Sequence, residues 1–139
     1  MKGQTGSLFR PAGLRATPQR EAILQVLDRS DRPLSAEEIL SRMRDFPTGV
    51  PTVYRNLHLF TVHGWVEPVL GKDKTLRFIR CHSSGHHHHI QCDHCGRMVE
   101  VDACGFSGNL ADFAERSGFH ITRHQLQMFG LCPECQSKF

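Results

Sequence analysis

The chain has 139 residues, a formal net charge of +3 at pH 7, six cysteines and ten histidines. A chain of this length forms one compact domain or two small ones, and small domains bury too little apolar surface to be stable without further support. No apolar run is long enough to span a bilayer, and residues 1–15 lack the apolar segment of a secretion signal, so we expect a cytoplasmic protein with no membrane partner. In that reducing compartment, this many cysteines and histidines favours metal ligation, with a disulfide framework as the alternative.

The charge is divided unevenly along the chain. Residues 1–80 contain 13 Lys and Arg against 8 Asp and Glu, a net charge of +5, whereas residues 81–139 contain 4 against 6, a net charge of −2. If the protein has an anionic partner, the first half is the part that faces it.

Three helices are predicted in the first half. The sequence TPQREAILQVLD at 17–28 begins with an N-cap threonine and a first-turn proline and continues with an apolar stripe. SAEEIL at 35–40 begins with a Ser-x-x-Glu capping box. PTVYRNLHLFTVHG at 51–64 begins on proline, places apolar residues at helical spacing and stops at glycine.

A hairpin is predicted directly after these helices. WVEPVL at 65–70 and TLRFIR at 75–80 are typical strands, and GKDK joins them as a turn. Three short helices followed by a hairpin is the element order of a winged helix, in which the third helix enters the DNA major groove and the hairpin lies along the DNA backbone. The predicted fold class is therefore α+β, with a winged-helix DNA-binding domain at 1–80.

The second half has the pattern of short strands around one helix. We place a hinge at 81–84 and a small α/β domain at 85–139. The predicted helix is NLADFAERSG at 109–118, with Leu110, Phe113 and Ala114 as its inner face. The predicted strands are HHHHIQC at 86–92, RMVEVD at 97–102 and FHITRHQLQMF at 119–129.

Four of the cysteines form two Cys-x-x-Cys pairs. Cys92 and Cys95 make up the first pair, and Cys132 and Cys135 the second. Four thiolates in two close pairs, separated by a folded stretch, are what a closed tetrahedral zinc site requires. A redox dithiol or inert buried cysteines are the alternatives. A zinc site here would attach the end of the chain to the first strand of its domain and contribute folding free energy.

Four consecutive histidines lie just before the first cysteine pair, at an internal position unlike that of an expression tag. On a strand, successive side chains point to opposite faces, so His87 and His89 share one face while His86 and His88 share the other. Two different sites are implied. Candidate partners are Cys81 and Glu67 for the first pair, and His124 with Glu100 or Asp102 for the second. The alternatives are that Cys81 is a small buried apolar residue and His124 an ordinary sheet histidine.

The segments GLRATPQREAIL, SAEEIL, PTVYRNL, HHHHIQCDHCG and FGLCPEC resemble, in order and approximate spacing, the ferric-uptake-regulator family of bacterial metal-dependent repressors. The resemblance extends from Gly13 to Cys135. It implies a homodimer paired through its C-terminal domains. It also implies that the two winged helices bind a palindromic operator in double-stranded DNA, and that a metal site near the hinge controls the angle between the domains.

The resemblance also implies roles for individual residues and two or three zinc ions per chain. A structural zinc would be held by Cys92, Cys95, Cys132 and Cys135. A regulatory zinc would be held by Glu67, Cys81, His87 and His89. A third site would consist of His86, His88, His124 and an acidic residue.

The chain departs from the family pattern at informative positions. Iron-sensing members usually have a carboxylate where this chain has Cys81, and a histidine where it has Arg32-Pro33-Leu34. Thiolate is a soft ligand that favours zinc over ferrous iron. At these positions the chain therefore resembles the zinc-uptake-regulator subgroup of the family. Ser107 stands where the third site usually has glutamate, and Cys104 receives no role.

The predicted function is a zinc-responsive repressor of zinc-uptake genes, with zinc as corepressor. The residues expected to contact DNA bases or phosphates are Arg15, Gln19, Arg20, Tyr54, Arg55, Lys72 and Lys74. Within the family, the alternative is an iron or peroxide sensor. A zinc-buffering protein would leave the winged helix unused, and a zinc hydrolase would need an open coordination position and a general base, so we do not expect an enzyme.

Overall fold

The computed structural model of the chain divides into two compact units, Met1–His82 and Ser83–Phe139, called here the first and the second unit. The structure describes residues 8–43, 47–82, 87–101 and 107–138. Within these ranges, no helix has both the length and the apolar character needed to cross a membrane. The role of residues 81–84 as a hinge stays a prediction.

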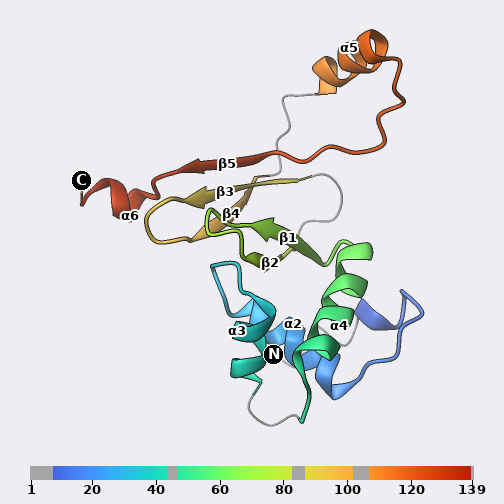
Figure 1. Cartoon of the computed structure of the whole chain (residues 1–139), viewed down its shortest axis with the longest axis vertical. Coiled ribbons are helices and arrows are strands. Elements are labelled where there is room, and N and C mark those ends of the chain that lie inside the picture. Colours follow the sequence, from blue (N-terminus) through green and yellow to red (C-terminus); the bar gives the residue numbers. More distant parts are fainter. Residues whose placement is uncertain (1–7, 44–46, 83–86, 102–106, 139) are drawn as a thin grey trace. The chain divides into compact units, whose positions relative to one another are not determined.

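The first unit has the three predicted helices, α2 (Pro18–Asp28), α3 (Ala36–Arg42) and α4 (Val50–Val62) (Figure 1). Side-chain caps fix where the first two begin. The hydroxyl of Thr17 accepts a hydrogen bond from the Arg20 N–H at 3.2 Å, and Ser35 and Glu38 make both hydrogen bonds of a capping box. The predicted helix starts are therefore confirmed, with α4 beginning one residue earlier than expected.

The predicted hairpin is confirmed as β1 (Val66–Leu70) and β2 (Leu76–Arg80), which pair antiparallel. This hairpin is the wing of the winged helix. Its tip is pre-organised because the guanidinium of Arg77 donates two hydrogen bonds to the carboxylate of Asp73, at 2.9 and 2.8 Å. The same carboxylate accepts the Thr75 N–H at 3.1 Å, and these donors hold the pKa of Asp73 well below its usual range.

Gly71, at the start of this turn, leaves room for the paired side chains of Asp73 and Arg77, which a larger residue would have to displace. A Cβ atom there would lie 2.7 Å from Asp73 Oδ1 and 2.8 Å from Arg77 Nη1. On the other side of the wing, Leu34 and Phe78 exchange backbone hydrogen bonds at 2.9 and 2.8 Å, which attaches the segment before α3 to β2. The wing is thus held to the helices by backbone bonds as well as by side-chain packing.

A single apolar core holds the first unit together. Its fully buried members include Ile23, Leu24, Leu27, Ile39, Val53, Leu57 and Phe60. The sequence analysis missed one contributor. Phe9, in a helical turn before α2, is 1% exposed, and its ring lies 6.0 Å from that of Phe60 and 5.6 Å from that of Trp65. Leu8 and Phe9 form an apolar pair without helical periodicity, so there was no sequence signal by which to find it.

The second unit contains a three-stranded sheet with the strand order β4-β3-β5. The strands are β3 (His88–Cys92), β4 (Met98–Val101) and β5 (Gln127–Gly130), and the helices are α5 (Ser107–Ser117) and α6 (Pro133–Gln136). β3 pairs antiparallel with β4 and parallel with β5. The prediction of a strand at 119–129 is wrong for 119–126. The parallel register sets His89 beside Gln127 and therefore His88, the first residue of β3, beside Leu126. Residues 119–125 lie before the start of β3, and the Leu126 N–H donates to the His88 ring.

The predicted helix at 109–118 is confirmed as α5, but its predicted inner face is wrong in part. Leu110 and Ala114 are half-buried, whereas Phe113 is 51% exposed. Apolar periodicity identifies the face of a helix that is suited to burial, and it does not say whether the same chain provides the covering surface. In the part of the chain that the structure describes, Phe113 on this face remains open to solvent.

Replacing Leu57 tests the assignment of the core. Leu57→Ala is expected to lower the unfolding free energy of the first unit by about 2–5 kcal/mol, because it removes buried methyl groups and leaves a cavity. Val62, 69% exposed on the same helix, provides the matched control, since Val62→Ala removes little buried surface. Denaturant unfolding followed by far-UV circular dichroism measures both, and equal effects of the two changes would contradict the assignment.

Candidate metal centres and DNA-binding surface

The two cysteine pairs meet because of the sheet register. β3 and β5 run parallel, and Cys92 at the end of β3 lies beside Gly130 at the end of β5. Each strand is followed directly by a tight turn that carries the remaining cysteines: Cys95 after β3, and Cys132 and Cys135 at α6. All four sulfur atoms lie within 4.8 Å of one another. The parallel pairing therefore converts two distant sequence motifs into one cluster.

The geometry of this cluster fits zinc. The sulfurs of Cys95 and Cys132 are 3.8 Å apart, and a tetrahedral site with zinc–sulfur bonds of about 2.3 Å has edges of about 3.8 Å. A disulfide would require a sulfur–sulfur distance of about 2.05 Å, so the disulfide alternative is excluded for these cysteines, which are free. The donor number, donor type and spacing are those of a closed structural site.

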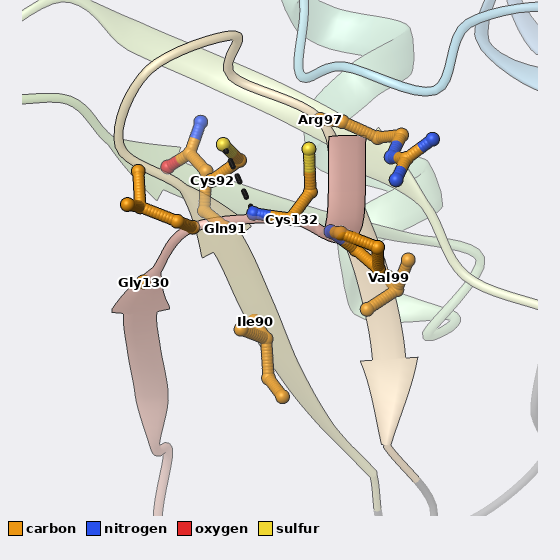
Figure 2. A pocket seen from close by; sticks show the side chains of 9 residues that line it. Ile90, Gln91, Cys92, Arg97, Val99, Gly130 and Cys132 are labelled. Atoms are coloured by element: carbon orange, nitrogen blue, oxygen red, sulfur yellow. Dashed lines mark hydrogen bonds between the residues drawn. The ribbon is translucent and has the colours of Figure 1, made fainter. Parts of the chain in front are cut away.

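Electrostatics also favours a cation at this position. The Cys132 N–H donates to the Cys92 sulfur at 3.4 Å (Figure 2) and is the main cause that lowers the pKa of Cys92 to about 5. The Cys135 N–H lowers the pKa of Cys132, while burial raises the pKa of Cys135 to about 12. Four thiolates so close together repel one another, and a bound divalent cation is what allows all of them to be ionised.

The histidine run, in which His87 precedes β3 and His88 and His89 begin it, presents two separate pairs. The rings of His87 and His89 lie 5.2 Å apart at an interplanar angle of 83°, and a nitrogen of each lies within 4.8 Å of the other. The ring of His88 instead lies 5.2 Å from that of His124. The Nδ1 atom of His88 accepts the Leu126 N–H at 3.2 Å, so a metal at His88 would be bound through Nε2.

Two details of the second histidine pair differ from expectation. His124 does not lie on the last strand but in the irregular segment before β5. Glu100 pairs with His89 in the register of β3 and β4, so its side chain shares the face of His89 and not that of His88. Glu100 is therefore the wrong acidic partner for His88. The other members suggested for this site, His86 and Asp102, lie outside the described residues, as does Cys104 and the side chain of Ser107.

Glu67 and Cys81 form a pair within the first unit. Glu67 lies opposite Ile79 in the hairpin, and the Cys81 N–H donates to the carbonyl oxygen of Trp65 at 2.9 Å, which continues the pairing by one step. The two side chains are therefore diagonal neighbours on one face. A Glu67 carboxylate oxygen lies within 4.8 Å of the Cys81 sulfur, and Cys81 is 5% exposed.

The residues expected to contact DNA all belong to the first unit. Tyr54 and Arg55 are exposed on α4, Lys72 and Lys74 are exposed on the wing, and Arg15 is exposed before α2; Gln19 and Arg20 are half-buried. Arg20 has a role that the sequence did not indicate. Its Nε donates to the Asn56 side-chain oxygen at 3.1 Å and its Nη1 to the Arg15 carbonyl at 2.8 Å. Arg20 thereby links the start of α2 to α4.

A winged helix combined with a unit built around paired cysteines and histidines defines a class of metal-dependent DNA-binding regulator. Residues 11–129 match the model of the ferric uptake regulator family. The chain belongs to this family, and it is a metal-responsive transcriptional regulator.

Relatives of the chain are named for different signals. It is 35% identical over 132 residues to the peroxide-responsive repressor PerR of Staphylococcus aureus (strain Mu50), covering 94% of this chain and 88% of the relative. It is similar to the solved structure of holo XcZur, with 28% identity, a TM-score of 0.81 and 99% of each chain covered. A structure of a zinc uptake regulator complexed with zinc and DNA shows 26% identity and a TM-score of 0.82, covering 97% of this chain and 92% of that chain.

The ferric uptake regulator Fur of Helicobacter pylori is also similar, with 28% identity, a TM-score of 0.61, and 96% of this chain and 89% of that chain covered. The family is thus shared by proteins named for iron, zinc and peroxide. Which of these signals the present chain is suited to must therefore be argued from its own metal-donor atoms.

Removing one sulfur tests the four-cysteine site. Cys132→Ser is expected to lose the tightly held zinc and to unfold the second unit, because a structural zinc contributes on the order of 10 kcal/mol of folding free energy. Cys81→Ser, outside this cluster, is the matched control and is expected to retain that zinc. Metal analysis and circular dichroism after dialysis give the answer, and a folded Cys132→Ser protein with unchanged zinc content would contradict the assignment.

Proposed function

We propose that the protein is a zinc-responsive repressor, in which zinc is the corepressor that promotes binding to a palindromic operator of zinc-uptake genes. The observation that carries this proposal is the pairing of Cys81 with Glu67. A thiolate in the regulatory site favours zinc over ferrous iron, because sulfur is the softer donor. The structures named holo XcZur and zinc uptake regulator complexed with zinc and DNA support the same choice.

In this proposal the regulatory metal takes one pair of ligands from each unit. The first unit contributes Glu67 and Cys81, and the second contributes His87 and His89. Each pair is pre-assembled within its own unit, as the distances within each pair indicate. A bound zinc would therefore restrict how the units are arranged. Zinc shifts the protein toward the arrangement that fits DNA only if that arrangement binds zinc more tightly than the other arrangements do.

The DNA-reading surface would be α4 with support from the wing. Tyr54 and Arg55 are assigned to bases and nearby phosphates, and both are exposed on this helix. The wing lysines Lys72 and Lys74, beside the rigid Asp73–Arg77 turn, are assigned to the DNA backbone. Arg15, Gln19 and Arg20 are assigned to the backbone as well. In the free protein, the bonds of Arg20 to Asn56 and Arg15 support the position of α4.

A homodimer is proposed to form through the second units. In the sheet order β4-β3-β5, the strand β5 lies at an edge and offers backbone groups for pairing. Exposed apolar side chains on α5 and β5, among them Phe113 and Phe129, provide surface to bury. Two winged helices related by a twofold axis then match a palindromic site in double-stranded DNA.

A third metal site remains part of the proposal. His88 and His124 supply two imidazoles at a ring distance of 5.2 Å, and His86 would add a third. A zinc occupancy of two or three ions per chain follows from this. The acidic ligand of this site is not assigned, so the site has fewer identified ligands than the regulatory site. We therefore expect a metal there to change the zinc concentration at which the protein responds, and not to be required for the response.

The main alternative is a peroxide- or iron-sensing repressor of the same family, which the 35% identity to PerR favours. The thiolate of Cys81 argues against it, since a site suited to soft zinc is poorly suited to ferrous iron. A zinc-buffering protein would use the ligands and leave the winged helix without a role. The location we propose is the cytoplasm, where a DNA-binding regulator acts, and we do not propose enzymatic activity.

Replacing Arg55 tests the reading helix. Arg55→Ala is expected to weaken operator binding by about 1–3 kcal/mol if it removes a base contact, or to lower the salt slope by about one if it removes a phosphate contact. Arg42→Ala, at an exposed position on α3 with no assigned DNA contact, is the matched control. Fluorescence anisotropy at several salt concentrations measures the difference. Unaltered binding by Arg55→Ala would exclude Arg55 from the reading surface.

Replacing Cys81 tests the metal switch. Cys81→Ser is expected to keep the fold, the dimer and the structural zinc, and to lose most zinc-stimulated DNA binding, because a hydroxyl is a poor zinc ligand at neutral pH. His88→Ala, on the opposite face of the strand, is expected to retain the response, shifted at most to higher zinc. A zinc titration of operator binding compares the two. A normal response from Cys81→Ser, or equal behaviour of both variants, would refute the division of ligands.

A further inference from the structure

Arg80 is the last residue of β2 and comes directly before Cys81. Its Nη1 donates hydrogen bonds to the carbonyl oxygen of Trp65, at 2.7 Å, and to that of Cys81. Its Nε lies 3.1 Å from a carboxylate oxygen of Asp28. The Arg80 side chain is 10% exposed. Because a guanidinium so far removed from water is costly unless it is paired, the ion pair with Asp28 balances its charge, while the hydrogen bonds from Nη1 to the two carbonyls fix its position.

These contacts fix the backbone of Cys81 on both sides. The strand pairing of β2 ends at Arg80, and beyond it the Cys81 N–H donates to the Trp65 carbonyl at 2.9 Å. The Cys81 carbonyl in turn accepts from Arg80. Both backbone polar groups of this residue are therefore engaged, which sets the direction of its side chain before a metal binds.

The same contacts connect Cys81 to two helices of the DNA-binding unit. Asp28 is the last residue of α2. The ring of Trp65 lies 5.7 Å from that of Phe60 and stacks on His63 at 4.9 Å, both at the C-terminal end of α4. A displacement of Cys81 is thus resisted through Arg80 by α2, and through Trp65 by α4.

We propose that Arg80, held by Asp28, is a positioning residue for the regulatory zinc. It fixes Cys81 as a ligand and joins that ligand to the ends of α2 and α4. This proposal rests on the proposed function, because it takes Cys81 as a zinc ligand; Arg80 itself does not contact the metal. The competing explanation is an ion pair that only stabilises the first unit, and such a pair would affect zinc binding equally whether or not Cys81 is present.

The test uses the full-length protein with its structural zinc bound, and titrates a second zinc equivalent against a chromophoric chelator. Fluorescence of Trp65, the one tryptophan of the chain, gives a second readout. Arg80→Gln and Asp28→Asn are each expected to weaken the second zinc about tenfold, as outer partners of metal ligands commonly do. Arg32→Gln removes an exposed arginine–aspartate pair in the same unit and is expected to bind zinc like the wild type.

A double-mutant comparison separates positioning from simple stabilisation. In the Cys81→Ser background, Arg80→Gln is expected to cause no further loss of zinc affinity, because the residue that it positions is already gone. The measurements are made at a temperature where circular dichroism shows every variant folded. An equal loss with and without Cys81, or wild-type affinity of Arg80→Gln, would overturn the positioning role alone. If the wild type bound no second zinc, or Cys81→Ser bound it normally, the proposed function would fail and this inference with it.

Discussion

The convergence of four sulfur atoms at the ends of β3 and β5 is the interaction on which the second unit depends. Among its described residues, those that are buried are His88, His89, Cys92, Met98 and Cys135. All except the methionine are candidate metal ligands. The first unit, by contrast, has an apolar core drawn from all its helices and the wing. Among the described residues of a single chain, the second unit thus buries donor atoms where the first unit buries apolar side chains, so a metal ion bound by them would supply folding free energy that apolar burial does not.

The two kinds of site differ in how their ligands are distributed, and this difference suits different roles. The four cysteines belong to one unit and are pre-arranged by the register of β3 and β5, so a metal there stabilises a structure that has one arrangement. In the proposed function the regulatory ligands are divided between the two units, so a metal bound by them would select among arrangements of the units. The rates of metal exchange should differ in the same way. Release of a metal from the four cysteines would require the second unit to unfold, whereas release from the regulatory ligands would not.

Local sequence signals were sufficient for much of the fold. Caps, a first-turn proline and apolar spacing predicted α2, α3 and α4, since these features act within one or two helical turns. The cysteine spacing predicted the sulfur cluster, because two separated Cys-x-x-Cys pairs are typical of a four-sulfur metal site and of few other structures. Alternation along the histidine run predicted that His87 would accompany His89, and their rings do lie side by side.

Features that depend on distant partners were not predictable in the same way. The start of β5 is set by where β3 begins, and the position of Glu100 is set by the register of β4, neither of which the local sequence records. Burial of Phe9 depends on the rings of Phe60 and Trp65. The exposure of Phe113 depends on what covers α5. Arg80 is inconspicuous in the sequence, and its importance comes from the three groups that surround it.

The central claim is that one chain binds zinc in two chemically distinct ways, once with sulfur alone and once with a mixed ligand set. X-ray absorption spectroscopy at the zinc edge, on protein with one and then two zinc ions per protomer, tests this most directly. The account predicts four sulfur neighbours at about 2.3 Å for the first ion. It predicts one sulfur together with nitrogen and oxygen neighbours at about 2.0–2.2 Å for the second. A second ion without any sulfur neighbour, or a first ion with fewer than four, would contradict it.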